Sequence, residues 1–216
     1  FIAAPGMPDW AVLTATMIGV SLVAAGTSAL NQYIERDLDA RMERTRNRPL
    51  PSKRMSPQEA MAFGLTTIFG GLLIVLIGVN LLAAVLTAAT SAIYVLIYTP
   101  LKTRTTANTL VGAVTGALPP MIGWAAATGS ISLNAFVLFA ILYVWQVPHF
   151  WAIAWIYRED YKRGGMKMLS CEDADGGLLA RQIVLWCVAL LVTSFLPVLV
   201  GMAGTVYAIG AIALGL

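Results

Sequence analysis

Residues 31–51, NQYIERDLDARMERTRNRPLP, mark the point where a long apolar stretch becomes densely charged. The preceding run, Trp10 to Leu30, holds no charged residue, whereas the quoted segment holds four carboxylates and five arginines. If the helix of the apolar run continues, Asn31, Glu35 and Asp39 lie one turn apart on the same face. Carboxylate and amide oxygens are ligands that Mg²⁺ prefers. The stretch therefore predicts a divalent-cation site at the end of a membrane-spanning helix.

Three arginines, Arg41, Arg44 and Arg48, follow this face at spacings of three and four. Planar guanidinium groups donate paired hydrogen bonds to phosphate oxygens, so metal and arginines together predict a membrane enzyme for a lipid diphosphate. The same residues have a simpler interpretation, in which the arginines only mark the cytoplasmic end of a helix and the acids only solvate it. The spacing alone leaves both interpretations open.

Hydrophobic residues make up 58% of the 216-residue chain, which is typical of membrane proteins. All fourteen Lys and Arg residues lie in three segments, 36–54, 102–104 and 158–181, and the turns between them carry none. Such alternation predicts a polytopic protein in a lipid bilayer with its basic loops on the cytoplasmic side. The net charge of +3 therefore reflects topology, and no nucleic-acid partner is expected. The two cysteines form no CxxC pair and predict no disulfide framework.

The hydrophobic pattern predicts an all-α fold, a single polytopic transmembrane bundle of about seven spans, because each apolar stretch has about the ~20 residues that cross the hydrocarbon core. The expected spans run from Trp10 into the charged segment, over 57–78, over 81–98, from 106–108 to the turn near 128–132, over 133–157, over 178–202 and over 205–216.

Local signals refine these boundaries. Residues 56–59, SPQE, form a capping box that begins the second span. Pro100 is expected to break the third span, and the pair Pro119-Pro120 to kink the fourth. The fourth span also holds small residues expected to allow close helix packing, namely Gly112, Gly116 and Ala117.

Alternating topology brings three loops, 36–56, 99–107 and 158–178, to one side of the membrane. Their basic residues are candidates for binding a diphosphate, and each is equally well explained as an ordinary cytoplasmic-loop charge. These candidates are Lys102, Arg104, Lys162 and Arg163. Asn108 either caps the fourth helix or faces the site, and the cap is the favoured interpretation.

The motif Asn31-x-x-x-Glu35-x-x-x-Asp39 resembles the signature of the UbiA superfamily of intramembrane prenyltransferases. Within that superfamily, three stretches resemble the haem O synthase branch, in which the first acidic position is Glu or Asp. They are the arm with Met42, Arg44, Thr45, Arg48, Pro49 and Leu50, the stretch YTPLKTRTTANTLVGAVTGALPPMIGW at 98–124, and WQVPHFWAIAWIYREDYKRGGMKML at 145–169.

This resemblance implies transfer of a farnesyl group from farnesyl diphosphate to a vinyl group of haem b, giving haem O for haem–copper oxidases. It implies Mg²⁺ held by Glu35 and Asp39. The implied catalytic residues are Asn31, Glu35, Asp39, Arg44 and Arg48. The implied substrate-binding residues are Lys102, Arg104, Asn108, His149, Asp160, Tyr161 and Lys162.

The resemblance also implies one domain over 1–216 that lacks helices of the family at both ends. The expected location is a bacterial plasma membrane, or alternatively a mitochondrial inner membrane, with the active-site loops facing the cytoplasm or matrix. Haem A synthase or terminal oxidase assembly factors are conceivable partners.

The resemblance leaves two points open: a second metal site and the role of His149. The superfamily usually carries a second Asp-rich motif at the start of the loop 158–178, but here the stretch 157–163 has only Glu159 and Asp160 as carboxylates, which leaves a second metal site open. His149, the only histidine, lies within the fifth span. It either contacts the haem, with iron ligation as one form, or hydrogen-bonds a neighbouring helix, and the sequence favours neither.

Three other functions compete with this interpretation. A quinone-type aromatic prenyltransferase acting on 4-hydroxybenzoate shares the metal motif and is the main alternative. A transporter is disfavoured because it would place ionisable groups near the bilayer midplane, whereas these acids, lysines and arginines lie at helix ends or in loops. A CDP-alcohol phosphotransferase needs glycines around its aspartates, and residues 31–51 contain none.

Overall fold

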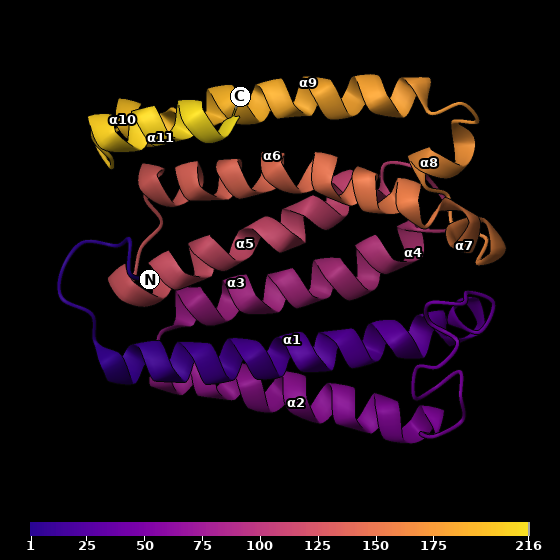
Figure 1. Ribbon diagram of the computed structural model, residues 1–216. Helices are drawn as coiled ribbons and strands as arrows, with labels where there is room; N and C mark the ends of the chain where they lie inside the picture. The colour runs from indigo at the N-terminus through magenta and orange to yellow at the C-terminus, as the bar shows by residue number, and fades with distance from the viewer. Residues whose placement is uncertain (216) are drawn as a thin grey trace.

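The computed structural model describes residues 1–215, and in this range all regular secondary structure is helical (Figure 1). The long helices are α1 (Trp10–Asp39), α2 (Pro57–Gly78), α3 (Leu81–Ala92), α5 (Asn108–Thr128), α6 (Leu133–Ile156) and α9 (Gly177–Thr193). The short ones are the π-helix η1 (Ile93–Tyr98), α4 (Thr99–Leu101), α7 (Arg158–Arg163), α8 (Leu169–Glu172), α10 (Leu196–Leu199) and α11 (Thr205–Gly215).

Within the described range, six helices are long and apolar enough to cross a membrane, when α3 is counted through to α4 and α9 through to α10. The helix α11 is a shorter apolar one. This arrangement confirms the predicted all-α transmembrane bundle of about seven spans. The chain is therefore an integral membrane protein.

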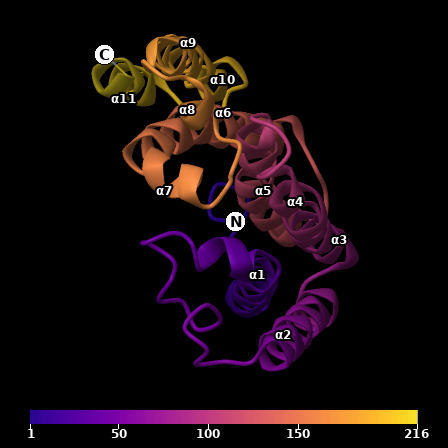
Figure 2. The same ribbon diagram turned by 90° about the vertical axis from the view of Figure 1, so that its right-hand side faces the viewer.

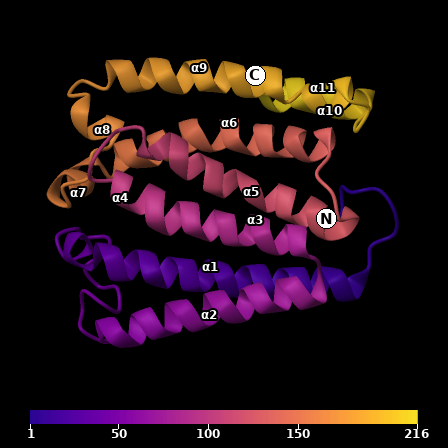
Figure 3. The ribbon, with the colours of Figure 1, turned by 180° about the vertical axis from the view of Figure 1, so that it is seen from behind.

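The long helices lie side by side, and the charged loops gather at one end of the bundle (Figures 1 and 3). Figure 2 views this loop end, where residues 40–56, here called the arm, lie with α4, α7 and α8. Hydrogen bonds tie the three loops together. The Lys167 N–H donates to the Lys102 carbonyl at 2.7 Å, and the Glu43 N–H donates to the Asp160 carboxylate at 3.0 Å. The predicted convergence of the loops is confirmed.

The pairing of α1 with α2 rests on glycines in both helices. A Cβ on Gly71 would lie 2.5 Å from the Gly19 carbonyl oxygen, and a Cβ on Gly26 would lie 2.5 Å from the Gly64 carbonyl oxygen. The backbones approach this closely only because neither helix carries a side chain at these positions. Through this contact α2 fixes the helix that carries the predicted metal ligands.

Helix ends follow the local sequence in most places. Asp9 caps α1 by accepting hydrogen bonds from the N–H groups of Ala11 and Val12. The predicted capping box is confirmed, since Ser56 accepts from the Glu59 N–H while the Glu59 carboxylate accepts from the Ser56 N–H. The helix α1 ends at Asp39, and the arm that follows consists of turns.

Two predicted boundaries were wrong. Pro100 does not break the third span, because the helix widens into the π-turn η1 just before it and continues through α4. A wider turn accommodates a proline ring that cannot donate a backbone hydrogen bond. The sixth span does not run unbroken to Met202, since α9 ends at Thr193 and α10 begins only at Leu196, beside Pro197.

Two of the small residues of α5 lie against side chains of neighbouring helices. A Cβ on Gly112 would lie 2.6 Å from the Tyr98 ring, and a Cβ on Gly116 would overlap the Gln146 amide. The two glycines therefore make room for the side chains of Tyr98 and Gln146. The helix α5 continues through Pro119 and Pro120 as one element.

Candidate active site at the loop end of the bundle

Three polar side chains line up on the inner face of α1, as the spacing predicted. Asn31, Glu35 and Asp39 are all buried, with Asp39 only 1% exposed. They line a cavity of about 260 Å³ that the arm, α4 and α7 enclose at the loop end. Buried carboxylates on a helix of a membrane protein require compensating groups.

Two basic side chains provide that compensation. Lys102 Nζ lies 2.9 Å from Glu35 Oε1 and 3.0 Å from Glu35 Oε2, with hydrogen-bond geometry only toward Oε2. Arg48 donates to Asp39 Oδ2 at 2.8 Å. The Lys102 ammonium also lies 4.7 Å from the centre of the Tyr98 ring, a cation–π distance. Both basic residues are therefore positioned by the acids that are the candidate metal ligands.

One oxygen of each carboxylate has no hydrogen-bond donor. Glu35 Oε1 and Asp39 Oδ1 are buried without a hydrogen bond, whereas Asn31 donates from Nδ2 to the Thr99 hydroxyl at 3.1 Å. Glu35 Oε1 is compensated by the Lys102 ammonium at 2.9 Å, whereas Asp39 Oδ1 is a buried acceptor without a donor, which is unfavourable unless a ligand supplies the missing interaction. Among residues 1–215 no group of three or more His, Cys, Asp and Glu side chains gathers as a metal site. The donor set fits a hard cation that is bound by two carboxylates and completed by water and substrate oxygens.

Arg44 closes the cavity from the arm. Its guanidinium donates to the Tyr161 hydroxyl at 3.0 Å and lies 4.8 Å from the centre of the Tyr157 ring. No carboxylate of the described chain lies within 4.0 Å of it. Arg44 therefore reaches the cavity as a positive charge held by aromatic groups.

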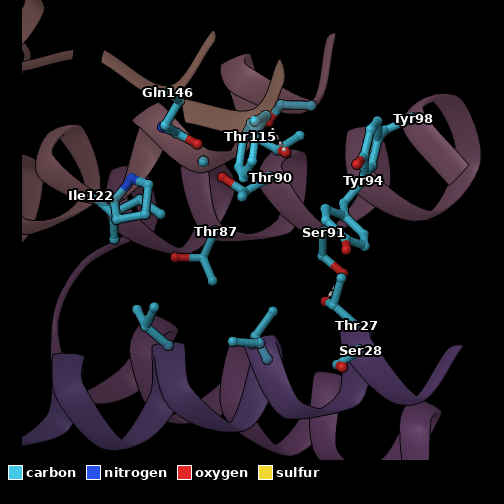
Figure 4. Close-up of a pocket in the computed structure, with 17 residues that line it drawn as sticks. Thr27, Ser28, Thr87, Thr90, Ser91, Tyr94, Tyr98, Thr115, Ile122 and Gln146 are labelled. Atoms are coloured by element: carbon cyan, nitrogen blue, oxygen red, sulfur yellow. Dashed lines mark hydrogen bonds between the residues drawn. The ribbon is translucent and has the colours of Figure 1, made fainter. Parts of the chain in front are cut away.

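A second, larger cavity continues the first toward the middle of the bundle (Figure 4). It has a volume of about 400 Å³ and shares three lining residues with the charged cavity, namely Tyr94, Tyr98 and Phe150. These aromatic residues form the junction between the two spaces. Sequence reasoning missed all three, although Tyr94, Tyr98 and Lys102 repeat at i, i+4 and i+8.

The inner cavity, here called the chamber, is apolar even though several hydroxyl groups line it. Thr27 and Ser91 hydrogen-bond each other at 2.6 Å, and Thr87 donates to the Ala83 carbonyl of its own helix (Figure 4). Hydroxyls satisfied in this way leave mainly methyl and aromatic surface for a ligand. A chamber of this kind suits a hydrocarbon chain.

Seven of the twelve predicted site residues line the charged cavity: Asn31, Glu35, Asp39, Arg44, Arg48, Lys102 and Tyr161. Arg104 and Lys162 do not. Arg104 is exposed, and Lys162 forms an ion pair with Glu159 at 3.3 Å on the outer face of α7. Asn108 is fully buried outside the cavity, where its Nδ2 donates to the carbonyls of Thr105 and Lys167.

The favoured interpretation of Asn108 as a helix cap was wrong. Asn108 is the first residue of α5, and the capping position, Ala107, has no side-chain hydrogen bond. The amide of Asn108 instead fastens the loop before α5 to the loop that holds Lys167.

His149 lies on an exposed face of α6 and lines neither cavity. Its ring stacks on Trp145 at a centroid distance of 4.8 Å and lies 5.8 Å from the ring of Phe150. No hydrogen bond to a neighbouring helix is formed within the described residues.

Asp160 lies beside the cavity and binds the arm. Its two carboxylate oxygens accept hydrogen bonds from the backbone N–H groups of Glu43 and Arg44, and Arg163 donates to one of them. Burial would raise the pKa of Asp160, but the hydrogen bonds from Arg163, Glu43 and Arg44 outweigh it and lower the pKa below its ordinary value. The carboxylate is therefore kept ionised by the groups that it binds.

An apolar chamber that opens through aromatic side chains onto a pocket of paired acids and bases defines an intramembrane transferase of lipid diphosphates. The comparisons agree with this class. The model of the UbiA prenyltransferase family matches residues 1–216, and the chain belongs to this family.

Named relatives are similar over most of the chain. Protoheme IX farnesyltransferase of Solibacter usitatus is 50% identical over 201 residues, which cover 93% of this chain and 69% of that protein. The protein of the same name from Sorangium cellulosum is 47% identical over 206 residues, 95% of this chain and 73% of that one. The mitochondrial protoheme IX farnesyltransferase of Homo sapiens is 44% identical over 194 residues, which cover 90% of this chain and 43% of that protein.

Two solved structures share the fold. The apo structure of a UbiA homologue from Aeropyrum pernix K1 superposes with a TM-score of 0.77 at 18% identity, covering 98% of this chain and 79% of that one. A structure of digeranylgeranylglyceryl phosphate synthase superposes with a TM-score of 0.73 at 19% identity, covering 95% of this chain and 73% of that one. The fold of this chain is that of UbiA prenyltransferases.

Proposed function

We propose that this chain transfers the farnesyl group of farnesyl diphosphate to a vinyl group of haem b, yielding haem O. One structural observation carries the proposal: the charged cavity and the apolar chamber meet at Tyr94, Tyr98 and Phe150. A diphosphate at the acids and a prenyl chain in the chamber would place the bond between them at this junction. The names of the similar proteins supply the choice of farnesyl and haem.

The charged cavity receives the diphosphate in this scheme. Glu35 and Asp39 would hold Mg²⁺, with Asn31 on the same face. When bound, Mg²⁺ neutralises charge that develops on the leaving diphosphate. Arg48 and Lys102 already lie against these carboxylates, so they can donate to phosphate oxygens as the C–O bond breaks.

The chamber and its aromatic junction act on the allylic group. The allylic carbon would lie at the junction, beside the rings of Tyr94 and Tyr98. The centres of these two rings are 5.0 Å apart, and the rings meet edge to face. Ring faces stabilise a positive charge, and the surrounding apolar surface excludes water until the acceptor vinyl carbon attacks. The new C–C bond joins that carbon to the farnesyl group, and water then supplies the hydroxyl of the haem O side chain.

The acceptor reaches the junction from the side of α6 in this scheme. Phe150 is 38% exposed while it lines both cavities, and the ring of the neighbouring exposed His149 lies 5.8 Å from the Phe150 ring. We therefore assign His149 to contact with the haem, including ligation of its iron. Replacement His149→Ala should weaken haem b binding and move the Soret band of the complex while leaving farnesyl diphosphate binding intact. An unmoved Soret band with unchanged haem affinity would exclude ligation.

The cellular setting is also part of the proposal. The basic loops at the site end face the cytoplasm of a bacterial plasma membrane or, in an organelle, the matrix. The hydrophobic product would pass to haem A synthase or to factors that assemble a terminal oxidase.

Membranes that carry the intact protein test the function directly. They are incubated with farnesyl diphosphate, Mg²⁺ and either haem b or 4-hydroxybenzoate, and the products are identified by mass spectrometry. Haem O is the expected product. A prenylated hydroxybenzoate would instead identify the quinone-type enzyme, which shares the metal-binding face of α1. Asp39→Asn is the matched inactive control.

A further inference from the structure

The charged cavity has an uneven number of acids and bases. Its lining contains two carboxylates, Glu35 and Asp39, and three basic groups, Arg44, Arg48 and Lys102, so its formal net charge is +1. Two of the basic groups are paired with the two acids. Arg44 therefore carries the whole excess charge of the cavity.

A net charge of +1 in the cavity lining matches the binding of one divalent cation. A prenyl diphosphate carries a charge of about −3, because its inner phosphate contributes about one negative charge and its terminal phosphate about two. One divalent cation together with the cavity's +1 balances that charge. A second divalent cation would leave an excess of about two positive charges in a site walled by apolar helices, which is unfavourable.

Arg44 is held in place by groups that do not neutralise it. Tyr157 and Tyr161 present their ring faces at 4.8 and 5.2 Å, and the Tyr161 hydroxyl accepts a hydrogen bond. Aromatic faces and a hydroxyl orient a guanidinium while leaving its charge available to an anion.

Asp160 fixes the backbone from which Arg44 extends. Its carboxylate accepts from two consecutive N–H groups of the arm, Glu43 at 3.0 Å and Arg44 at 3.2 Å. Next to this clamp, Met42 is 1% exposed and lies over Gly164, where an added Cβ would come within 2.9 Å of the Met42 sulfur. The arm is therefore docked on α7 by one polar and one apolar contact immediately beside Arg44.

We propose that Arg44, docked by the positioning residue Asp160, serves as a built-in second cation, so that the diphosphate is bound with a single divalent metal ion. The proposal rests on the proposed function only in taking a prenyl diphosphate as ligand. It assigns Asp160 to the arm and not to the substrate or to a metal.

The number of bound metal ions tests whether the diphosphate is bound with a single divalent ion. The intact protein in detergent is titrated with Mn²⁺ in the presence of the unreactive farnesyl thiolodiphosphate, and bound Mn²⁺ is measured by electron paramagnetic resonance. One Mn²⁺ per chain is expected, and two would overturn the proposal. Arg44→Gln should weaken binding of the analogue by about tenfold or more, the loss of one charge-assisted hydrogen bond. An unchanged affinity would likewise overturn it.

Hydrogen exchange tests whether Asp160 positions the arm and Arg44. In Asp160→Asn the amides of the arm should exchange faster and the analogue should bind more weakly. Glu159→Gln is the matched control, because among residues 1–215 Glu159 pairs only with Arg158 and Lys162, and its replacement should change neither quantity.

Gly164→Val provides a second way to undock the arm, with Asp160 left intact. It should displace Met42 and reproduce both effects of Asp160→Asn. Faster exchange of the arm with unchanged affinity for the analogue, in both variants, would overturn the positioning role. None of these readouts depends on the acceptor, so a failure to produce haem O would refute the proposed function without altering this result.

Discussion

Replacing Glu35 by Gln should destabilise the protein strongly, because it leaves Lys102 charged and buried. The Lys102 side chain is only 9% exposed and that of Glu35 only 4%. Gln keeps the shape of Glu and an acceptor oxygen but removes the opposite charge. Loss of one partner of a buried ion pair costs about 3–5 kcal/mol, whereas loss of an exposed pair costs under about 1 kcal/mol.

The expected shift is large enough to measure. For a chain of this size each kcal/mol changes Tm by about 2–4 °C, so Glu35→Gln should lower Tm by about 6–20 °C. The double variant Glu35→Gln with Lys102→Met should recover most of this loss, since it removes the buried charge as well. Thermal unfolding in detergent, followed by circular dichroism, measures both.

Asp39→Asn is the matched comparison. Its partner Arg48 has a side chain that is 37% exposed and can turn toward water, so the loss should be no more than about 1 kcal/mol. A Tm of Glu35→Gln equal to that of Asp39→Asn, or a double variant no more stable than the single one, would refute the buried-pair reasoning.

Asp39→Asn should also abolish Mg²⁺-dependent prenyl transfer, and product formation in membranes at several Mg²⁺ concentrations measures this. Ile122→Phe, at the deep end of the chamber, should lower kcat/KM for farnesyl diphosphate more than for the shorter geranyl diphosphate; an equal loss would place the chain elsewhere. The pKa of Asp160 is lower in the folded protein, so its stabilisation should be complete above about pH 4 and be lost as pH falls further. Unfolding across pH should show this dependence flattened in Asp160→Asn. Impermeant thiol reagents should reach Cys171 and a Ser130→Cys variant from opposite sides of the membrane, and labelling from one side would refute the topology.

The sequence predicts those parts of the site that depend on one helix or on loop topology. Asn31, Glu35 and Asp39 share a face because helix periodicity alone puts them there. The loop that holds Lys102 meets the end of α1 because alternate loops lie at one end of the bundle, although its ion pair with Glu35 was not predicted. Neither inference needs knowledge of how helices pack.

The remaining parts of the site depend on contacts that leave no recognisable pattern in the amino-acid sequence. Asp160 binds backbone N–H groups more than a hundred residues away, and every residue except proline offers such a group. The position of Gln146 is equally hard to predict, because its amide occupies the space left by Gly116 on another helix. The glycines of α1 and α2 were detectable in principle, since Gly19 and Gly26 are spaced like Gly64 and Gly71.

The two internal ion pairs also bear on the order in which ligands arrive. While Lys102 and Arg48 occupy the carboxylates, a free metal ion meets acids that are already neutralised and should bind weakly. A diphosphate draws both basic groups toward itself and so releases carboxylate oxygens for the metal. Each ligand then raises the affinity for the other by the same factor. The resting enzyme should accordingly be insensitive to changes in Mg²⁺ concentration and respond to the metal only when prenyl donor is present.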